Sequence, residues 1–310
     1  MNNFHSSFYT RLFFSCAKWV AVVIAYLLLS YFCEKQTKGF SVLGILPDRP
    51  FDPAWQTKSP SSVEQEEIDI ALAQKYSYLS KGGQCYAFVS ADGNYVIKFL
   101  RQKVYRVPLW HKLIPIPFVF DRYKEKKRLK REDKLLRDFS SYKFAFEELQ
   151  EMTGLLFIHL NPTQHLKRHL TVSDRLHIEH QLDLDRFDFV LQKRAQMISP
   201  TISALIQQKR IDEAKQLIDQ VVQLVIERCQ KGLEDWDPEV RTNCGFIEGR
   251  VIKIDVGRFI PNEEMKTAQM CRRELLRIIE PFQGWLCHQS APLADYCDEA
   301  MEKALLTVSE

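Results

Sequence analysis

The segment "NCGFIEGRVIKIDVG", residues 243–257, constrains the fold of this chain more than any other. Two short apolar runs flank a Glu248-Gly249 turn, which is the pattern of a tight β-hairpin. Asn243 precedes the first run and Asp255 follows the second, so closing the hairpin brings an amide and a carboxylate together. The segment therefore predicts a rigid hairpin that presents two oxygen donors at its open end.

The N-terminal residues 19–33, "WVAVVIAYLLLSYFC", carry no charge, and with "FFSCAK" they supply the roughly twenty residues that cross a bilayer. A cleaved signal peptide is the alternative, because Arg11 and Lys18 form a basic flank. Bulky and charged residues follow instead of a small-residue cleavage site. We therefore expect an uncleaved single-pass membrane anchor over residues 1–35, which contacts membrane lipid. Lys35 and Lys38 nearly balance the basic flank, so the orientation stays open.

Residues 36–61 contain four of the chain's prolines, at positions 47, 50, 53 and 60. Repeated prolines remove backbone donors and block helix formation, so this segment predicts a stiff, extended linker with the folded domain after it. Ser62 with Gln65 three positions later resembles a capping box that starts a helix.

Composition excludes several classes of protein. With 310 residues, 45% apolar and 27% charged, the chain has the make-up of a globular protein. Its net charge of +3 is too small for a nucleic-acid binder, so no nucleic-acid partner is expected. The cysteines contain no C-x-x-C pair and no regular spacing, so they indicate neither a zinc site nor a disulfide framework, and a reducing compartment is favoured. They stand at positions 16, 33, 85, 229, 244, 271, 287 and 297.

Residues 76–100 alternate strand-like runs with two turn signals, one of them Gly82-Gly83, and they predict three antiparallel strands. Lys98 lies inside the third strand, where a lysine is either solvated or functional. Residues 101–138 then form a basic insertion, with eight Lys/Arg and four Asp/Glu between Lys124 and Asp138. This insertion is either a solvated helix or a segment that lies on anionic lipid. In the second case the interface would take up Trp110, Leu113, Ile116 and Phe118.

A helix is predicted over "SYKFAFEELQEMTGLL", with Glu148 beside its apolar face. That face carries Tyr142, Ala145, Leu149 and Met152. Two further strands follow up to residue 191, and a long amphipathic helix then ends at Gly232, before the asparagine-bearing hairpin.

This order of parts resembles the protein-kinase-like superfamily over roughly residues 76–260. The resemblance implies ATP and Mg²⁺ as cofactors. It places Gly82 and Gly83 in the nucleotide loop, although they depart from the full G-x-G-x-x-G. By "YVIK", Lys98 would contact the nucleotide phosphates and pair with Glu148. By "DVG", Asp255 would bind magnesium, with Asn243 as a second ligand. One carboxylate and one amide oxygen also suit this hard cation on chemical grounds.

The catalytic loop departs from the family pattern H-R-D-x-x-x-x-N. It reads "DWDPEVRTN", and five residues instead of four separate Asp237 from Asn243. If the loop bulges by one residue, Asp237 accepts the proton of an acceptor hydroxyl. If it does not, Asp235 is the substitute base.

The resemblance implies an α+β, protein-kinase-like bilobal fold after the membrane helix, with an antiparallel N-lobe sheet. We expect residues 62–192 to form the N-lobe with its basic insertion, and residues 193–310 a reduced, mainly helical C-lobe that carries the loop and "DVG". No A-P-E motif follows Asp255, so the chain is closer to small-molecule phosphotransferases, such as aminoglycoside and lipid-sugar kinases, or to a pseudokinase.

Three functions follow from these patterns. The first is a membrane-anchored phosphotransferase that uses Mg-ATP on an unknown acceptor, either a small molecule or a protein. The second is a pseudokinase scaffold that binds a partner protein without phosphoryl transfer, and the third is an α+β membrane-attached protein without a nucleotide. ATP supply and the basic insertion favour a cytoplasmic domain. The acceptor, the side of the membrane, the oligomeric state and the organism are left open.

Overall fold

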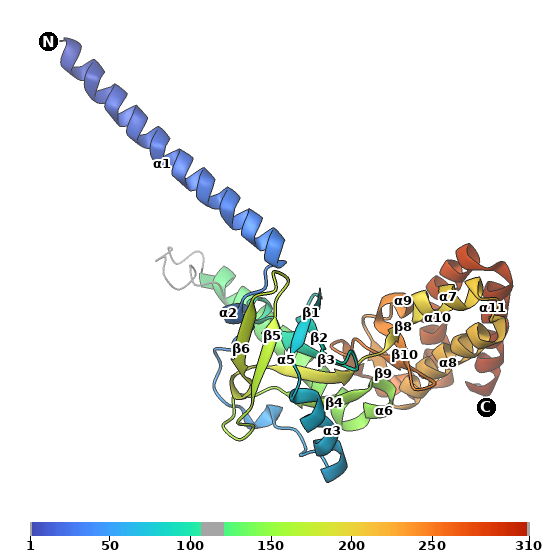
Figure 1. Ribbon diagram of the computed structural model, residues 1–310. Coiled ribbons are helices and arrows are strands. Elements are labelled where there is room, and N and C mark those ends of the chain that lie inside the picture. Colours follow the sequence, from blue (N-terminus) through green and yellow to red (C-terminus); the bar gives the residue numbers. More distant parts are fainter. Residues whose placement is uncertain (1, 107–120, 309–310) are drawn as a thin grey trace.

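The computed structural model describes residues 2–106 and 121–308, which form a sheet-based N-lobe and a helical C-lobe (Figure 1). A helix of 36 residues, α1 (Asn2–Thr37), projects from the N-lobe on the side away from the C-lobe. Within the described chain it is the one helix long and apolar enough to cross a membrane, over Ala17–Thr37, and no residue of this stretch is buried. By length and composition, α1 suits a membrane span or a signal sequence.

The N-lobe contains a seven-stranded sheet in the order β4-β7-β3-β2-β1-β5-β6. The three strands predicted over residues 76–100 are confirmed, and each pairs antiparallel with its neighbour. They are β1 (Tyr76–Lys81), β2 (Cys85–Ser90) and β3 (Tyr95–Leu100). The other four are β4 (Leu155–His159), β5 (His169–Ser173), β6 (Glu179–Asp183) and β7 (Phe189–Lys193).

The predicted antiparallel sheet needs one correction, because β5 pairs parallel with β1. The β5–β6 hairpin covers an edge of β1 that would otherwise present unpaired backbone groups. Strand β4 was also missed, because its residues were read as the end of the preceding helix. Gly154, with φ of 65°, ends that helix and lets the chain enter the sheet.

The proline-rich segment is not an extended linker. Its side chains Phe40, Ile45 and Trp55 are buried among N-lobe residues. The Arg49 guanidinium lies 2.5 Å from the buried carboxylate of Asp188. The prolines therefore stiffen a strap, residues 38–60, that is fastened across the N-lobe by aromatic burial and an ion pair. A short helix within it is α2 (Val42–Ile45).

Among the described residues, the N-lobe also contains the helices α3 (Ser62–Leu72), α5 (Asp121–Glu148) and α6 (Gln150–Thr153). The apolar face predicted for the helix before β4 is confirmed, since its four side chains are all buried: Tyr142, Ala145, Leu149 and Met152. The capping box of α3 is one residue earlier than predicted and joins Ser61 to Glu64. Helix α5 also carries the charged half of the basic insertion. The predicted lipid-facing residues Trp110, Leu113, Ile116 and Phe118 lie outside the described residues.

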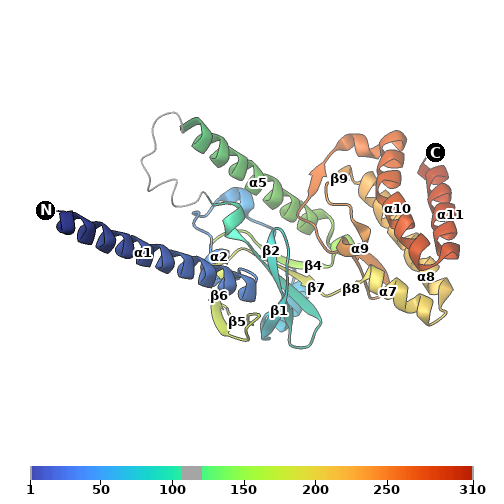
Figure 2. The ribbon, with the colours of Figure 1, turned by 90° about the horizontal axis from the view of Figure 1, so that it is seen from above.

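The C-lobe is mainly helical, as predicted. Helix α8 is amphipathic and packs against α10 and α11, and Figure 2 shows the three side by side. The helices are α7 (Ile198–Gln207), α8 (Ile211–Gln230), α9 (Val240–Asn243), α10 (Ala268–Gln289) and α11 (Ala291–Val308). Five short strands form two small sheets in this part of the chain, in the orders β11-β10-β8 and β12-β9. They are β8 (Gln196–Met197), β9 (Leu233–Asp235), β10 (Cys244–Ile247), β11 (Arg250–Lys253) and β12 (Phe259–Pro261).

Candidate functional site

The predicted hairpin is confirmed by β10 and β11, which pair from Cys244 opposite Lys253 to the tight turn. Both turn residues have positive φ, 48° at Glu248 and 85° at Gly249, as a two-residue hairpin turn requires. At the open end the backbone N–H of Ile254 donates to the Asn243 carbonyl at 2.8 Å. This bond fixes the chain just before Asp255 against Asn243.

The catalytic-type loop accommodates its extra residue. The chain forms the single helical turn α9, which ends at Asn243, and the side chain of Glu239 caps that turn. The Asn243 amide nitrogen then donates to the Asp237 carboxylate at 3.0 Å and to the Asp237 carbonyl at 3.1 Å. Asp237 is half-buried. The bulged loop that was one of the two predicted alternatives therefore brings Asp237 beside Asn243.

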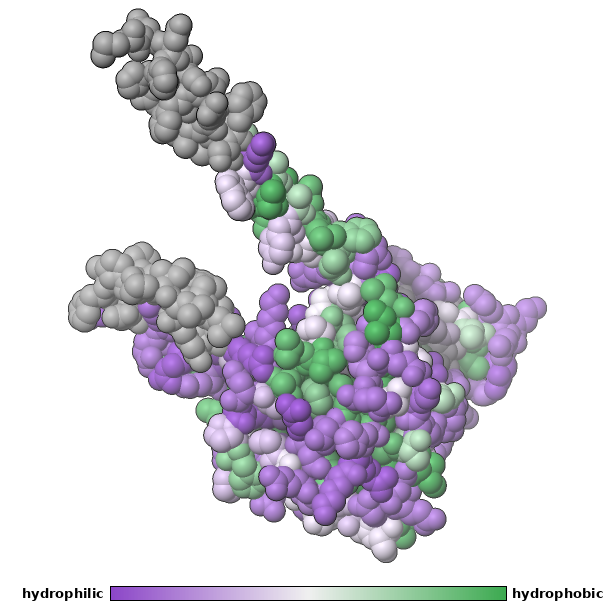
Figure 3. All heavy atoms as spheres, turned by 60° about the vertical axis from the view of Figure 1, so that its left-hand side comes forward, coloured by the Kyte–Doolittle hydropathy of each residue, from purple (hydrophilic) through white to green (hydrophobic). Residues whose placement is uncertain are grey.

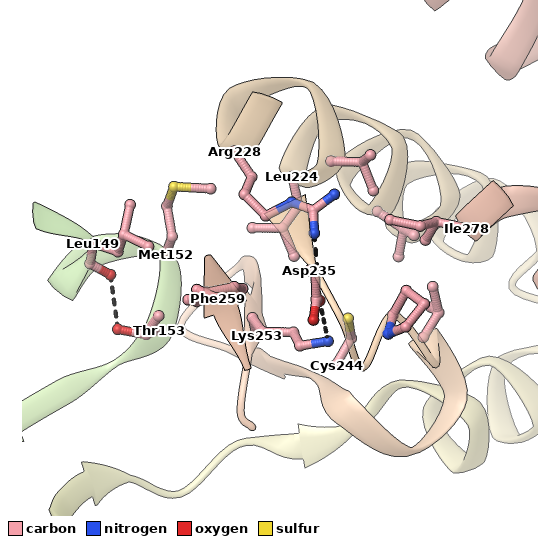
Figure 4. A pocket seen from close by; sticks show the side chains of 14 residues that line it. Leu149, Met152, Thr153, Leu224, Arg228, Asp235, Cys244, Lys253, Phe259 and Ile278 are labelled. Atoms are coloured by element: carbon pink, nitrogen blue, oxygen red, sulfur yellow. Dashed lines mark hydrogen bonds and ion pairs between the residues drawn. The ribbon is translucent and has the colours of Figure 1, made fainter. Parts of the chain in front are cut away.

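Asp235 lies in a different environment, because its buried carboxylate is fully engaged. One of its oxygens accepts the backbone N–H of Asp237 at 2.8 Å, and the other lies 2.6 Å from the Lys253 ammonium. The Arg228 guanidinium lies 3.5 Å from the same carboxylate, and Figure 4 shows Arg228 and Lys253 on opposite sides of it. Both oxygens of Asp235 are contacted by other residues of the described chain, so the geometry fits a positioning role for this residue.

The charges around Asp235 continue into the C-lobe core. Arg228 on α8 lies 2.6 Å from Glu274 on α10, and Arg277 lies 2.7 Å from the same carboxylate. Burial alone would raise the pKa of Glu274, but its contacts with Arg277 and Arg228 hold it below the ordinary value. A cavity of about 30 Å³ adjoins this group, lined by Arg228, Asp235, Lys253 and mostly apolar side chains. Sequence reasoning missed this network, although Arg228 and Glu274 stand on the apolar faces of their helices.

Lys98 reaches the same end of the hairpin from the N-lobe. It is half-buried on β3, and its ammonium donates to the carbonyl of Ile254, the residue before Asp255. The Cys85 thiol shares this neighbourhood. Burial raises the pKa of Cys85 to about 11, while Lys98 lowers it and Asp255 raises it. The structure therefore brings Lys98 and Asp255 together, and Asp255 itself is half-buried.

The predicted ion pair between Lys98 and Glu148 is absent from the described structure. Glu148 is the last residue of α5, where its side chain is exposed and its carbonyl accepts from Lys231 at 3.3 Å. The part of α5 that faces the "DVG" segment lies earlier. There the Ser141 hydroxyl donates to the Val256 carbonyl and accepts the Phe259 N–H at 2.7 Å. The helix is in the expected place, but the predicted carboxylate is not.

The glycine turn is held by its own lobe. Arg101 donates to the carbonyls of Gly82 and Gly83 at 2.8 and 3.0 Å, and both glycines are exposed. The next residue, Gln84, is buried and donates to the Gly257 carbonyl at 3.1 Å.

A second contact fixes Gln84 from α5, because the Tyr142 hydroxyl donates to its amide oxygen at 3.0 Å. Burial raises the pKa of Tyr142 well above its ordinary value. A Cβ atom added at Gly257 would lie 2.0 Å from the Gln84 amide oxygen, so any other residue there would displace the Gln84 amide from this contact. The glycine turn is thus pinned directly onto the "DVG" segment.

The donors at the open end of the hairpin fit magnesium chemically. Two carboxylates, Asp237 and Asp255, and the Asn243 amide are hard oxygen ligands of the kind this ion prefers. Across residues 2–106 and 121–308, no group of three or more His, Cys, Asp or Glu side chains could hold a metal. A magnesium ion would therefore need further oxygens from water or from nucleotide phosphates, as it has in phosphotransferases.

No protein-family model and no curated protein matches the sequence of this chain. Solved structures do match, at low identity. The ROP18 kinase domain, in complex with AMP-PNP and sucrose, is 14% identical over 69% of this chain and 72% of its own, with a TM-score of 0.36. The bifunctional kinase-methyltransferase WbdD is 12% identical over 71% of this chain and 42% of its own, with a TM-score of 0.35. Rv3197 from Mycobacterium tuberculosis, in complex with erythromycin, is 12% identical over 86% of this chain and 74% of its own, with a TM-score of 0.32.

These scores are low, so the assignment of the fold rests on the arrangement within the chain itself. A sheet with a central lysine strand precedes a long helix against the "DVG" segment, and a catalytic-type loop leads into the hairpin. Lys98, Asn243 and Asp255 meet between the two lobes. The chain therefore has the α+β architecture of two lobes, with a mainly helical C-lobe, that the sequence predicted.

Proposed function

We propose that this chain is a membrane-anchored phosphotransferase that uses Mg-ATP. The observation that carries the proposal is the convergence of Lys98, Asp237, Asn243 and Asp255, from separate segments, at the open end of one hairpin. Lys98 would bind the nucleotide phosphates, and Asn243 and Asp255 would hold Mg²⁺. Asp237 would accept the proton of an acceptor hydroxyl, and Gly82 and Gly83 would cover the phosphates.

Asp235 and Glu148 take different roles in this proposal from those first predicted. The occupied carboxylate of Asp235 fixes the backbone of Asp237, so Asp235 positions the base instead of replacing it. Glu148 is exposed and does not contact Lys98 in the described structure, so we assign it no contact with the nucleotide. The acceptor is a small molecule or a protein.

The membrane is the proposed partner of α1, which has the length and composition of a span. The charged first half of α5 projects from the N-lobe toward the side from which α1 leaves it, as Figures 1 and 2 both show. Its surplus of basic residues suits the anionic inner leaflet, which supports a cytoplasmic domain.

Nucleotide binding by the full chain in detergent micelles tests the proposal. The full chain is needed because removing residues 1–60 would strip Phe40, Ile45 and Trp55 from the core. We expect Mg-ATP and Mg-ADP to raise the melting temperature. At a ligand concentration one hundred times Kd, binding should stabilise the folded chain by about 3 kcal/mol. Asp255→Asn should abolish the magnesium-dependent part of this shift.

Glu148→Gln is the matched variant, since it neutralises another carboxylate that the sequence singled out. We expect it to keep the full nucleotide shift, because its side chain is exposed and away from Lys98. A chain that neither nucleotide stabilises in the presence of magnesium ends the proposal. An equal loss in the two variants would restore Glu148 to the site.

A pseudokinase scaffold is the second candidate, and the Gln84 contact favours it. The residue after the glycine turn is bound to Gly257 and Tyr142, so side chains of the chain itself join the two lobes. A scaffold would keep its cellular role when Asp255 is replaced by Asn, whereas a phosphotransferase would lose it.

A further inference from the structure

The connection between α1 and the N-lobe core is only two residues long. Helix α1 ends at Thr37, and Phe40 is already buried in the N-lobe core, with 5% of its surface exposed. Lys38 and Gly39 make the whole connection, and both have positive φ, 53° and 73°. If α1 spans a bilayer, the N-lobe surface around this joint lies at the depth of the lipid headgroups.

The N-lobe also grips the end of the helix. Arg175 donates to the carbonyls of Lys35 and Gln36 at 3.2 and 3.3 Å, which satisfies groups that a helix C-terminus leaves free. The Tyr86 hydroxyl donates to the Gly39 carbonyl at 2.5 Å. These bonds fix the direction of α1 relative to the lobe, so the lobe presents one face to the bilayer.

That face is basic. We call it the collar, and its exposed lysines Lys38, Lys81 and Lys103 stand close together. Partial burial lowers the pKa of Lys81, and the positive charges of Arg101, Lys103 and Lys38 lower it further, while Glu34 opposes them. The carboxylates that pair with collar residues are Glu34 and Asp48. The collar consists of Lys35, Lys38, Lys81, Arg101, Lys103, Arg106 and Arg175.

An apolar turn lies beside the collar. The turn between β5 and β6 exposes 47% of Leu176 and 53% of Ile178. The buried carboxylate of Asp174 accepts the backbone N–H groups of these two residues at 2.8 and 3.0 Å, so the turn is held rigid. Figure 1 places this turn beside the end of α1, and Figure 3 shows apolar side chains gathered on the N-lobe below that helix.

We infer that the collar and the Leu176–Ile178 turn form a docking surface for anionic phospholipid, which holds the N-lobe against the bilayer in one orientation. Basic side chains would meet the headgroups while the two apolar side chains enter the interface. Charge complementarity and continuity with the span both favour lipid as the occupant. The inference rests on the proposed membrane anchoring by α1, and it is independent of phosphoryl transfer.

The docking surface adjoins the glycine turn. Arg101 belongs to the collar and also holds the carbonyls of Gly82 and Gly83. Lipid bound at the collar would therefore lie next to the turn that is proposed to cover the nucleotide. An acceptor within or on the membrane would be presented to the same side of the lobe.

Hydrogen exchange of the full chain in nanodiscs tests this surface. One set of discs contains phosphatidylcholine alone, and the other also contains phosphatidylserine. We expect exchange in the segment 174–178 to slow by about tenfold in the anionic discs, since each basic residue of the collar adds to the attraction between the N-lobe and the anionic surface. The triple variant Lys38→Glu, Lys81→Glu, Lys103→Glu should abolish the difference.

A matched triple variant, Lys209→Glu, Lys231→Glu, Lys303→Glu, changes the net charge equally at exposed lysines of the C-lobe. It should keep the lipid-dependent slowing.

Resistance of α1 to alkaline extraction from liposomes reports the anchoring separately. If the chain is anchored but segment 174–178 exchanges at the same rate in both kinds of disc, the docking surface is overturned. An equal response of the two triple variants overturns it as well. A chain extracted by alkali overturns the anchoring on which the surface depends. Slowing that needs an added protein instead of anionic lipid would make the surface a protein interface and would also overturn the inference.

Discussion

The two halves of the candidate site are built in different ways. In the C-lobe half, Asp237 is fixed by Asn243 and by a buried network that includes Asp235 and Lys253. In the N-lobe half, Lys98 is held by a single backbone carbonyl. The proposed metal side is therefore preorganised, whereas the proposed phosphate side would have to give up contacts to bind a nucleotide.

This difference assigns separate roles to rigidity and adaptability. Oxygen donors for a hard cation need fixed geometry, and a network of buried ion pairs provides it at the hairpin. A lysine bound to one carbonyl can exchange that partner for a phosphate, which is a stronger, charge-assisted acceptor. We expect nucleotide binding to change the N-lobe half far more than the C-lobe half.

Breaking the buried network should have the largest effect. Lys253→Met would leave the Asp235 carboxylate buried without its 2.6 Å partner, and we expect a loss of about 4 kcal/mol in the free energy of unfolding. Urea denaturation of the full chain in detergent micelles measures it. Nucleotide-dependent stabilisation should fall as well, because the Lys253 ammonium also donates to the Asp237 carbonyl.

Arg250→Met provides the control on the same strand. Arg250 pairs with Glu151 at 3.2 Å, but both side chains are largely exposed, so its removal should cost only about 0.5 kcal/mol. Similar losses in the two variants would mean that the C-lobe half owes little to the buried network, and the comparison between the halves would fail.

Removing the contacts that hold the N-lobe half should lower the free energy of unfolding less than breaking the buried network does. It should raise nucleotide affinity, whereas breaking the network lowers nucleotide-dependent stabilisation. Gln84→Ala removes the bonds to Gly257 and Tyr142, and we expect it to lower the free energy of unfolding by about 2 kcal/mol. Nucleotide affinity should rise, because binding no longer has to break those contacts. Isothermal calorimetry with Mg-ADP measures the affinity.

Gln74→Ala is the matched variant, since Gln74 makes two hydrogen bonds with exposed Asp92 in the same lobe. It should leave nucleotide affinity unchanged. A fall in affinity in the Gln84 variant would show that this side chain supports the nucleotide turn instead of closing it.

Local patterns in the sequence predicted the hairpin of the C-lobe half. The Glu248-Gly249 turn defines the hairpin by itself, so the positions of Asn243 and Asp255 followed from turn chemistry and strand pairing alone. The bulge before Asn243 was one of two stated alternatives, because sequence does not show how a loop absorbs an extra residue. The Asp235 ion pairs join residues far apart in the chain and could not be predicted.

The N-lobe half was predicted less well because its contacts depend on tertiary packing. Glu148 has the helical spacing expected of a partner for Lys98, but the helix ends at that residue and turns its carboxylate outward. The prolines of the strap predicted an extended linker, which was wrong, because nothing local showed that Trp55 would be buried. The β5–β6 hairpin made the sheet mixed for the same reason, since an edge strand chooses its partner in space.

The smallest predicted effect concerns the point where the strap ends and α3 begins. The Ser61 hydroxyl accepts the Glu64 N–H, and the Glu64 carboxylate accepts the Ser61 N–H at 2.7 Å. Ser61→Ala should therefore lower the free energy of unfolding by about 1 kcal/mol, whereas Ser62→Ala should change it little. Bonds from the Ser61 backbone and side chain lower the pKa of Glu64, so the contribution of this cap is present above the ordinary pKa and is lost as the pH falls through the lowered value. Urea denaturation of both variants at neutral and acidic pH checks this. A larger loss for Ser62→Ala would move the helix start back to the predicted residue and shorten the part of the N-lobe half that α3 fastens to the sheet.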